Sequence, residues 1–125
     1  MLAFLLDENI SSEVARQILV KRPEIVIESV HFWHNGTFKA QRDEDILIAA
    51  AKEDLTFATY DQKTIFPVLA RWGETGIDHS GVIFIDDRTI PSNQYGAIML
   101  SLTMLWDAHR SDSWTNRVQF LRNSP

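Results

Sequence analysis

Acidic side chains follow three short apolar segments of this sequence, close to the point where each segment ends. Asp7, Asp61 and Asp86 hold these positions. Short, continuously apolar segments are typical of strands buried on both faces of a parallel sheet. Ligands of open α/β sheets bind outside the carboxyl ends of the strands. Asp43 and Asp45 begin an expected helix, which a right-handed crossover can bring to the same edge.

Carboxylates that converge without any cysteine fit a hard cation, which we expect to be Mg²⁺ or Mn²⁺. Such ions activate water and stabilise the transition state of phosphodiester cleavage. Each acid also has a simpler interpretation. Asp43 can cap a helix, Asp45 can complement the helix dipole, and Asp61 can form a turn. Asp86 and Asp87 precede Arg88, and of the two we expect Asp87 to form an ion pair with it.

Neighbouring polar residues have expected supporting roles. Asn9 is expected to tie the strand-to-helix turn through its side chain, Glu8 to be solvated, and Thr59 to be structural. Cations near the expected pocket would bind phosphates: Lys39, Arg42, Lys63 and Arg88.

Strand and helix patterns alternate along the chain. We expect strands at Leu2–Leu6, Ile25–Val30, Leu55–Thr59, Gly81–Ile85 and Trp114–Leu121, the last at a sheet edge. We expect helices from Ser11 or Ser12 to Pro23, over Asp43–Glu53 and Thr64–Trp72, and from Ser92 or Asn93 to His109, with residues 31–42 as a loop. In the third helix, Pro67 is tolerable only in the first turn, and Gly73 and Gly76 end the helix. This alternation predicts one α/β domain over residues 1–125, with a parallel sheet covered on both faces.

Composition narrows the class of protein. The chain has 125 residues, 45% of them hydrophobic, which suits one domain with a real core. It has no cysteine, which excludes disulfides and thiolate metal sites. No apolar run is long enough to cross a bilayer, and the N-terminus does not resemble a signal peptide, so we expect a cytoplasmic protein. The net charge of −5 argues against nucleic-acid binding over the whole surface, although a local basic groove remains compatible with it.

Three stretches together resemble a known family. The segments "LLDEN", "DEDILIAAAKEDLTFATYD" and "GVIFIDDRTI" are similar to short PIN-like proteins, which are related to the VapC toxin nucleases and to the Mut7-C ribonuclease group. The resemblance implies a PIN-like three-layer α/β/α sandwich with a mostly parallel sheet. It also implies a Mg²⁺- or Mn²⁺-dependent endoribonuclease that acts on RNA, and the toxin half of a toxin–antitoxin pair with a small antitoxin protein as partner.

The family pattern implies roles for individual residues. Asp7 matches the first metal ligand and Asp61 the acid after the threonine, whereas Asp43 and Asp45 compete for the helix-start position. Lys63 stands where the family has a second acid after that threonine. A lysine there either holds the scissile phosphate or marks a weakened catalyst, and Asp86 is a replacement ligand if it reaches the site.

Two other classes of function stay open at this point. A noncatalytic PIN-like binding module is favoured by Lys63 and by the negative net charge. A phospho-accepting receiver domain shares the acid pair after the first strand, but it would need a lysine after the last strand, and no lysine follows Lys63. A homodimer is also conceivable, with Met99, Met104 and Trp106 either at its interface or in the core.

Overall fold

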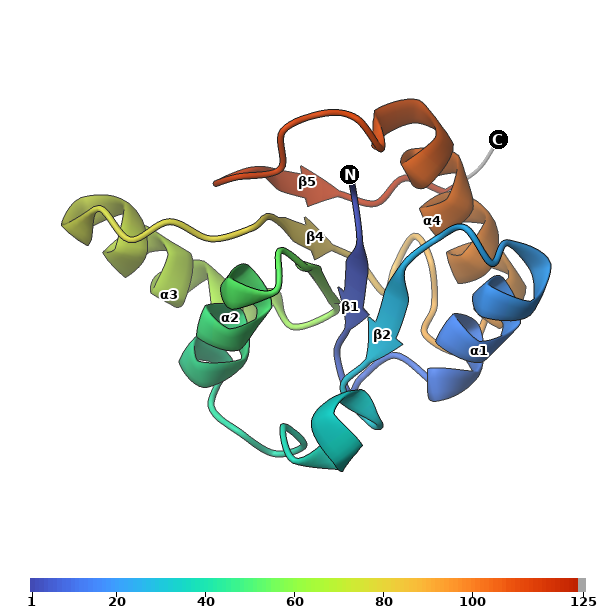
Figure 1. Cartoon of the computed structure of the whole chain (residues 1–125), viewed down its shortest axis with the longest axis horizontal. Coiled ribbons are helices and arrows are strands. Elements are labelled where there is room, and N and C mark those ends of the chain that lie inside the picture. Colours follow the sequence, from blue (N-terminus) through green and yellow to red (C-terminus); the bar gives the residue numbers. More distant parts are fainter. Residues whose placement is uncertain (124–125) are drawn as a thin grey trace.

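The structure, a computed structural model, describes residues 1–123 and contains one parallel sheet (Figure 1). Its strand order is β2-β1-β3-β4-β5 and every neighbouring pair is parallel. The strands are β1 (Phe4–Leu6), β2 (Ile27–Ser29), β3 (Thr56–Thr59), β4 (Val82–Phe84) and β5 (Val118–Phe120). The expected edge position of the last strand is therefore confirmed, and the sheet is entirely parallel in the described residues.

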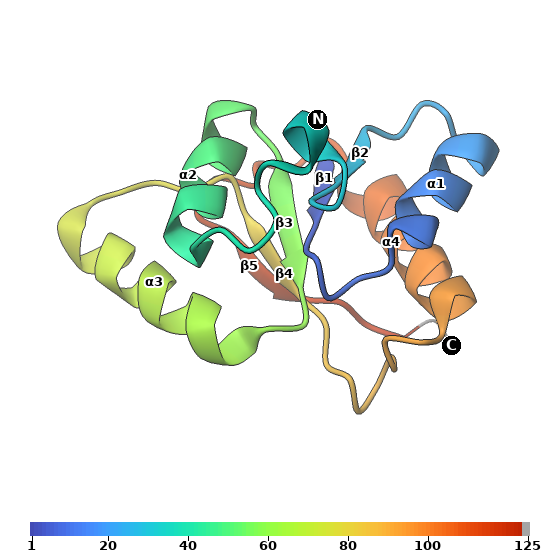
Figure 2. The ribbon, with the colours of Figure 1, turned by 90° about the horizontal axis from the view of Figure 1, so that it is seen from below.

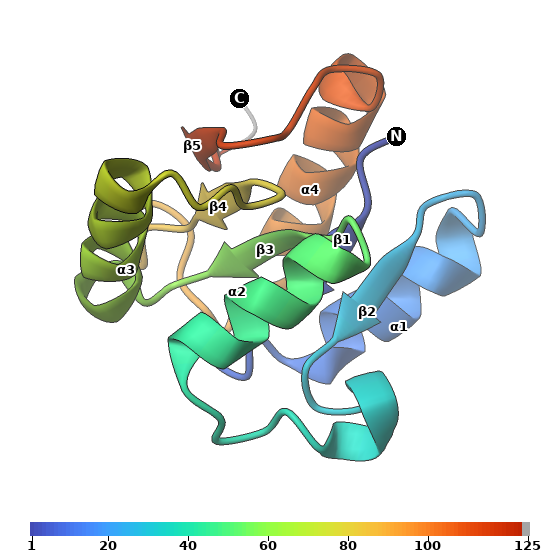
Figure 3. The same cartoon turned by 60° about the vertical axis from the view of Figure 1, so that its left-hand side comes forward.

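Helices cover both faces of the sheet. They are α1 (Ser12–Lys21), α2 (Asp43–Lys52), α3 (Gln62–Thr75) and α4 (Tyr95–His109), with a short 3₁₀ segment at Trp33–Gly36. Buried side chains of α1 and α4 pack with Phe4 and Leu6 on one face. Those of α2 and α3 pack with Leu5 and Phe57 on the other face. Figure 3 shows α2 lying across the sheet, and the predicted three-layer α/β/α arrangement is confirmed.

The connections reverse direction at β1, and this fixes where a ligand site would lie. The chain leaves β1 through α1 to reach β2 on one side, and β3 pairs with the opposite side of β1. In doubly wound sheets of this order, the crevice at such a switch point is the usual ligand site. Here it lies between the carboxyl ends of β1 and β3.

Two helix starts differ from the sequence prediction. α3 begins at Gln62 because the side chain of Asp61 accepts a hydrogen bond from the Thr64 backbone N–H and caps the helix. Pro67 consequently stands in the second turn, not in the first as expected. α4 begins at Tyr95 after Gln94, without a side-chain cap, so the predicted start at Ser92 or Asn93 is wrong.

The glycines near the end of α3 also act differently from one another. Gly73 lies inside the helix, whereas Gly76 ends it with φ of 74°. Glycine, which has no Cβ, adopts this left-handed conformation at little cost. Of the residues considered for a dimer interface, Met99 and Trp106 are buried in the core and Met104 is exposed.

No helix in residues 1–123 is long and apolar enough to span a membrane.

Candidate functional site

Asp7 follows β1 at the switch point, and its carboxylate is held by neutral donors. The residue is only 9% exposed. One carboxylate oxygen accepts a hydrogen bond from the Glu8 backbone N–H at 2.7 Å. The other accepts from the Thr59 hydroxyl at 2.7 Å and from the Asn9 amide at 3.3 Å. All of these donors are neutral, and together they fix the position of the carboxylate.

The alternation of side chains along β1 and β3 explains this meeting. Leu5 and Phe57 belong to the core cluster under α2 and α3. Two residues further along each strand, Asp7 and Thr59 extend the same face, because side chains alternate with a period of two. The register agrees, since Asp7 donates its backbone N–H to the Ala58 oxygen at 2.9 Å. Asp7 therefore faces the side on which α2 begins.

The surroundings of Asp7 disfavour its ionised form. Burial raises the pKa of the Asp7 carboxyl above its ordinary value, and the hydrogen bonds from Thr59 and Glu8 oppose this rise. The negative charges of Asp43 and Glu8 raise the pKa further. The negative charge of Asp43, in the first turn of α2, therefore acts on the Asp7 carboxyl.

Asn9 and Thr59 connect the ends of β1 and β3. The Asn9 amide donates to the Thr59 hydroxyl at 3.2 Å, and its oxygen accepts from the Tyr60 backbone N–H at 3.3 Å. Thr59 also accepts from the Asp61 N–H at 2.9 Å. The side chain of Asn9 thus links the turn after β1 to the end of β3.

The first turn of α2 separates the two alternative helix acids. Arg42 is the N-cap residue and Asp43 is the first helical residue, so Asp43 does not cap this helix. Asp43 is half-buried, whereas Asp45 is exposed. Because Asp43 acts on the pKa of Asp7, it is the helix acid better placed to share a ligand with Asp7.

Asp61 lies at the same sheet edge as Asp7, on the neighbouring strand end, but both of its carboxylate oxygens bind Thr64. One accepts from the backbone N–H at 3.2 Å and the other from the hydroxyl at 2.6 Å. These are the bonds of a helix cap. The role of Asp61 as a metal ligand stays a prediction, and it requires the carboxylate to use its remaining lone pairs or to leave the cap.

Asp86, after β4, binds Arg88. Its oxygens accept from the Arg88 backbone N–H at 2.9 Å and from the guanidinium at 2.9 and 3.2 Å. These hydrogen bonds lower the pKa of the Asp86 carboxyl. The expected pairing of Asp87 with Arg88 is therefore wrong. Asp87 accepts instead from the Ser92 backbone N–H at 2.9 Å.

The predicted phosphate-binding cations differ in their partners. Arg88 is bound to Asp86, and Arg42 lies 3.5 Å from a Glu44 oxygen. Lys39 and Lys63 are exposed, and the structure assigns neither an ion pair within residues 1–123. Of the four predicted cations, these two lysines are therefore the ones not paired with a carboxylate in the described residues.

Glu8 is a residue whose role the sequence prediction missed, because its contacts come from a distant loop. Its side chain accepts a hydrogen bond from the Ala40 backbone N–H, and its backbone oxygen accepts from His31 Nε2 at 2.9 Å. Ala40 has φ of 59°, a left-handed conformation that costs a residue with Cβ about 1 kcal/mol. Glu8 thus ties the loop before α2 to the end of β1.

The donor set at the switch point was compared with what a divalent ion needs. No group of three or more His, Cys, Asp or Glu side chains within residues 1–123 is arranged to hold a metal ion. Mg²⁺ is commonly held by one or two carboxylates, with water and substrate phosphate completing its shell. Asp7 and Asp43 supply two hard oxygen donors whose mutual repulsion a cation would relieve. They fit such an ion.

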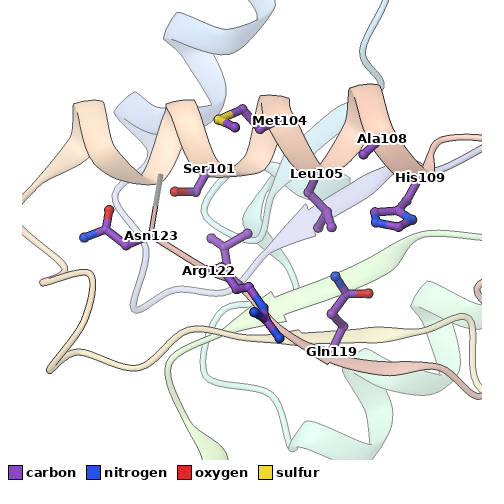
Figure 4. Close-up of a pocket in the computed structure, with 9 residues that line it drawn as sticks. Ser101, Met104, Leu105, Ala108, His109, Gln119, Arg122 and Asn123 are labelled. Carbon is purple, nitrogen blue, oxygen red and sulfur yellow. The ribbon is translucent and has the colours of Figure 1, made fainter. Parts of the chain in front are cut away.

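A separate hollow of about 260 Å³ lies between α4 and β5, away from these acids. Figure 4 shows Ser101 and Leu105 reaching from α4 toward the strand, with Arg122 and Gln119 opposite. Ser101 is 3% exposed, and its hydroxyl has no hydrogen-bond partner among the described residues. The hollow holds none of the acids predicted to bind metal.

Comparisons with known proteins add no family to this geometry. No family model, no curated protein and no solved structure matches the chain.

Proposed function

We propose that this chain is a Mg²⁺- or Mn²⁺-dependent endoribonuclease of the PIN-like type. The observation that carries the proposal is the buried Asp7 carboxylate, which neighbours Asp43 at the switch point of a parallel sheet. We further propose the setting that the sequence resemblance implies: a cytoplasmic toxin whose partner is a small antitoxin protein.

In this proposal each residue has a defined task. Asp7 and Asp43 hold the ion, while Thr59 and Asn9 keep the Asp7 carboxylate in one orientation through their hydrogen bonds. A bound divalent ion would supply an activated water and would stabilise negative charge on the phosphate in the transition state. Lys39 and Lys63 bind RNA phosphates.

The proposal is tested by cleavage of a labelled single-stranded RNA with Mn²⁺ present or removed by chelation. We expect cleavage by the parent protein only with Mn²⁺. The cleavage rate of Asp7→Asn should be lower by a factor of about 100 or more. Asp54→Asn is the matched control. Asp54 lies before β3, at the opposite edge, and its φ of 57° is one that Asn adopts readily. Equal rates for parent and Asp7→Asn would refute the proposal.

A noncatalytic RNA-binding module is the second candidate. It is favoured by the use of both Asp61 oxygens in capping α3, which leaves fewer free carboxylates than a full cluster would have. Lys63 in place of an acid points the same way. RNA binding by the parent protein without any Mn²⁺-dependent cleavage would favour this function.

A further inference from the structure

Three phenylalanine rings form a cluster in which one pair is stacked and the third ring is tilted against both. The ring centroids of Phe66 and Phe84 are 4.4 Å apart with an interplanar angle of 26°. Phe120 lies 5.6 Å from Phe84 and 6.4 Å from Phe66, with angles of 38° and 36°. Phe84 is fully buried, so it forms the base on which the other two rings rest.

The two outer rings remain open to solvent. Phe66 is 42% exposed and Phe120 is 46% exposed. One face of the Phe66 ring stacks on Phe84, and the exposed fraction of Phe66 leaves part of its side chain open to solvent. A further flat ring could therefore stack on Phe66 and extend the Phe66–Phe84 pair. We call Phe66 and Phe120, over Phe84, the aromatic platform.

The aromatic platform lies at the same sheet edge as the candidate site. Phe84 and Phe120 are the last residues of β4 and β5, and Phe66 lies in the second turn of α3, the helix that Asp61 caps. Figure 2 shows α3 starting near the carboxyl ends of these strands. An RNA strand bound near Asp7 would therefore have the aromatic platform along the same carboxyl edge of the sheet.

The charged side chains near the aromatic platform would allow a nucleic-acid phosphate to bind beside it. Lys63 precedes Phe66 by three residues on α3, so the two side chains share a face of the helix. Among residues 1–123 the ion pairs involve other cations, which leaves the Lys63 ammonium available. The nearby carboxylate of Asp86 is already balanced by Arg88.

We propose that the aromatic platform stacks bases of single-stranded RNA while Lys63 binds an adjoining phosphate. This inference rests on the proposed function and names its substrate class as unpaired RNA. Every base has a flat face, so the contact would not select a sequence, and paired bases are already stacked and cannot use it. A protein partner would need only exposed apolar side chains. The aromatic rings, the neighbouring Lys63 and the place of both at the carboxyl edge of the sheet favour RNA instead.

Binding of a labelled single-stranded oligoribonucleotide, measured by fluorescence anisotropy in a chelating buffer, tests the platform without cleavage. Phe66→Leu keeps an apolar side chain but removes the flat ring, and we expect affinity to fall about tenfold, as for the loss of one stacked base. Phe66→Trp should restore parental affinity. Phe120→Leu is a second variant in case Phe66→Leu disturbs the fold.

The matched control is Phe32→Leu. Phe32 is 73% exposed and follows β2, the outer strand on the opposite side of the sheet from β5, so its loss should leave stacking on the platform, and with it the affinity, unchanged. Lys63→Gln should reduce the dependence of log affinity on log salt concentration by about 0.7, the value for one phosphate contact on a single strand. A fluorescent base analogue in the RNA should be quenched by the parent protein and less so by Phe66→Leu.

Unchanged RNA affinity in both Phe66→Leu and Phe120→Leu overturns the inference, as does the absence of RNA binding by the parent. A parent dimer that Phe66→Leu converts to a monomer in sedimentation, with RNA affinity unchanged, would assign the platform to a protein interface. Failure of the nuclease proposal is separate: RNA binding that depends on Phe66, without Mn²⁺-dependent cleavage, would leave the platform standing.

Discussion

Asp7 and Asp86 occupy equivalent places in the chain and opposite electrostatic environments. Each follows an apolar strand, β1 or β4, at the carboxyl edge of one sheet. Burial raises the pKa of Asp7, and like charges nearby raise it further. The hydrogen bonds of Arg88 lower the pKa of Asp86.

The difference teaches that position at a strand end does not identify a metal ligand. What matters is whether the protein itself already balances the charge. Arg88 does so for Asp86 through its backbone and guanidinium N–H groups. Asp7 has only neutral donors and acidic neighbours, so a cation would gain more from binding there.

The largest expected difference between Asp7 and Asp86 is in the growth of bacteria that express variants of each residue. Expression of the parent chain alone should slow growth, and Asp7→Asn should relieve this because it removes a carboxylate that the proposed ion needs. Asp86→Asn should remain toxic, and coexpression of a small antitoxin encoded beside the chain should restore growth. Growth curves, with the amount of folded protein checked by thermal melting, measure this. Normal growth with abundant folded parent protein would count against a toxin.

Stabilisation by Mn²⁺ is the next largest effect expected. An ion that binds only the folded state at a hundredfold excess over Kd adds about 2.7 kcal/mol to the free energy of unfolding. The parent and Asp86→Asn should show this gain in thermal melts, whereas Asp7→Asn should lose most of it. Equal gains in all three proteins would remove the distinction between Asp7 and Asp86.

Asp61 provides a test of intermediate size, because its cap and its predicted metal role can be separated. Asp61→Ala should lower the free energy of unfolding by about 1 kcal/mol through loss of the cap, whereas Asp61→Asn should lower it by a few tenths. Denaturant unfolding measures both. The Mn²⁺ gain in Asp61→Asn then decides the second role, since a ligand would lose the gain and a pure cap would keep it.

The pH dependence of stability without metal should be the smallest effect. Because the folded-state pKa of Asp7 is raised, the folded protein binds this proton more tightly than the unfolded chain does. Stability should therefore fall as pH rises from 3.8, the ordinary pKa of an aspartate, through the raised pKa of Asp7. For Asp86, with a lowered pKa, the contribution has the opposite sign and is lost as pH falls below 3.8.

Unfolding free energies of the parent, Asp7→Asn and Asp86→Asn, measured in a chelating buffer across this pH range, test both signs. Asp7→Asn should lack the downward slope with rising pH, and Asp86→Asn should lack the loss at low pH. A parent whose stability has the same slope as Asp7→Asn would show that Asp7 titrates normally.

The layers and the site edge could be predicted from sequence because they depend on local patterns. Short apolar runs located the strands, and helical spacing located the helices between them. The acids at strand ends then followed from the topology. Asp7 and Asp61 lie on neighbouring strands, as their places after apolar runs predict.

The predictions that were wrong concern which polar group binds which partner. Asp61 caps α3 and so moves its start before Thr64, while Asp86 rather than Asp87 binds Arg88. The contact of Glu8 with Ala40 crosses 32 residues and a left-handed backbone that no local signal announced. Such choices are settled by tertiary geometry.

The wholly parallel sheet also has a consequence for synthesis. The carboxylate of Asp7 and the hydroxyl of Thr59 that holds it are separated by 52 residues in the chain. At ordinary translation rates, a ribosome needs roughly 3–10 s to add a segment of that length. No pair of strands in this sheet is joined by a local hairpin, so β1 has no neighbouring strand to pair with when it emerges. A nascent chain that stops before β3 would contain Asp7 but would lack Thr59, the residue whose hydroxyl holds the Asp7 carboxylate.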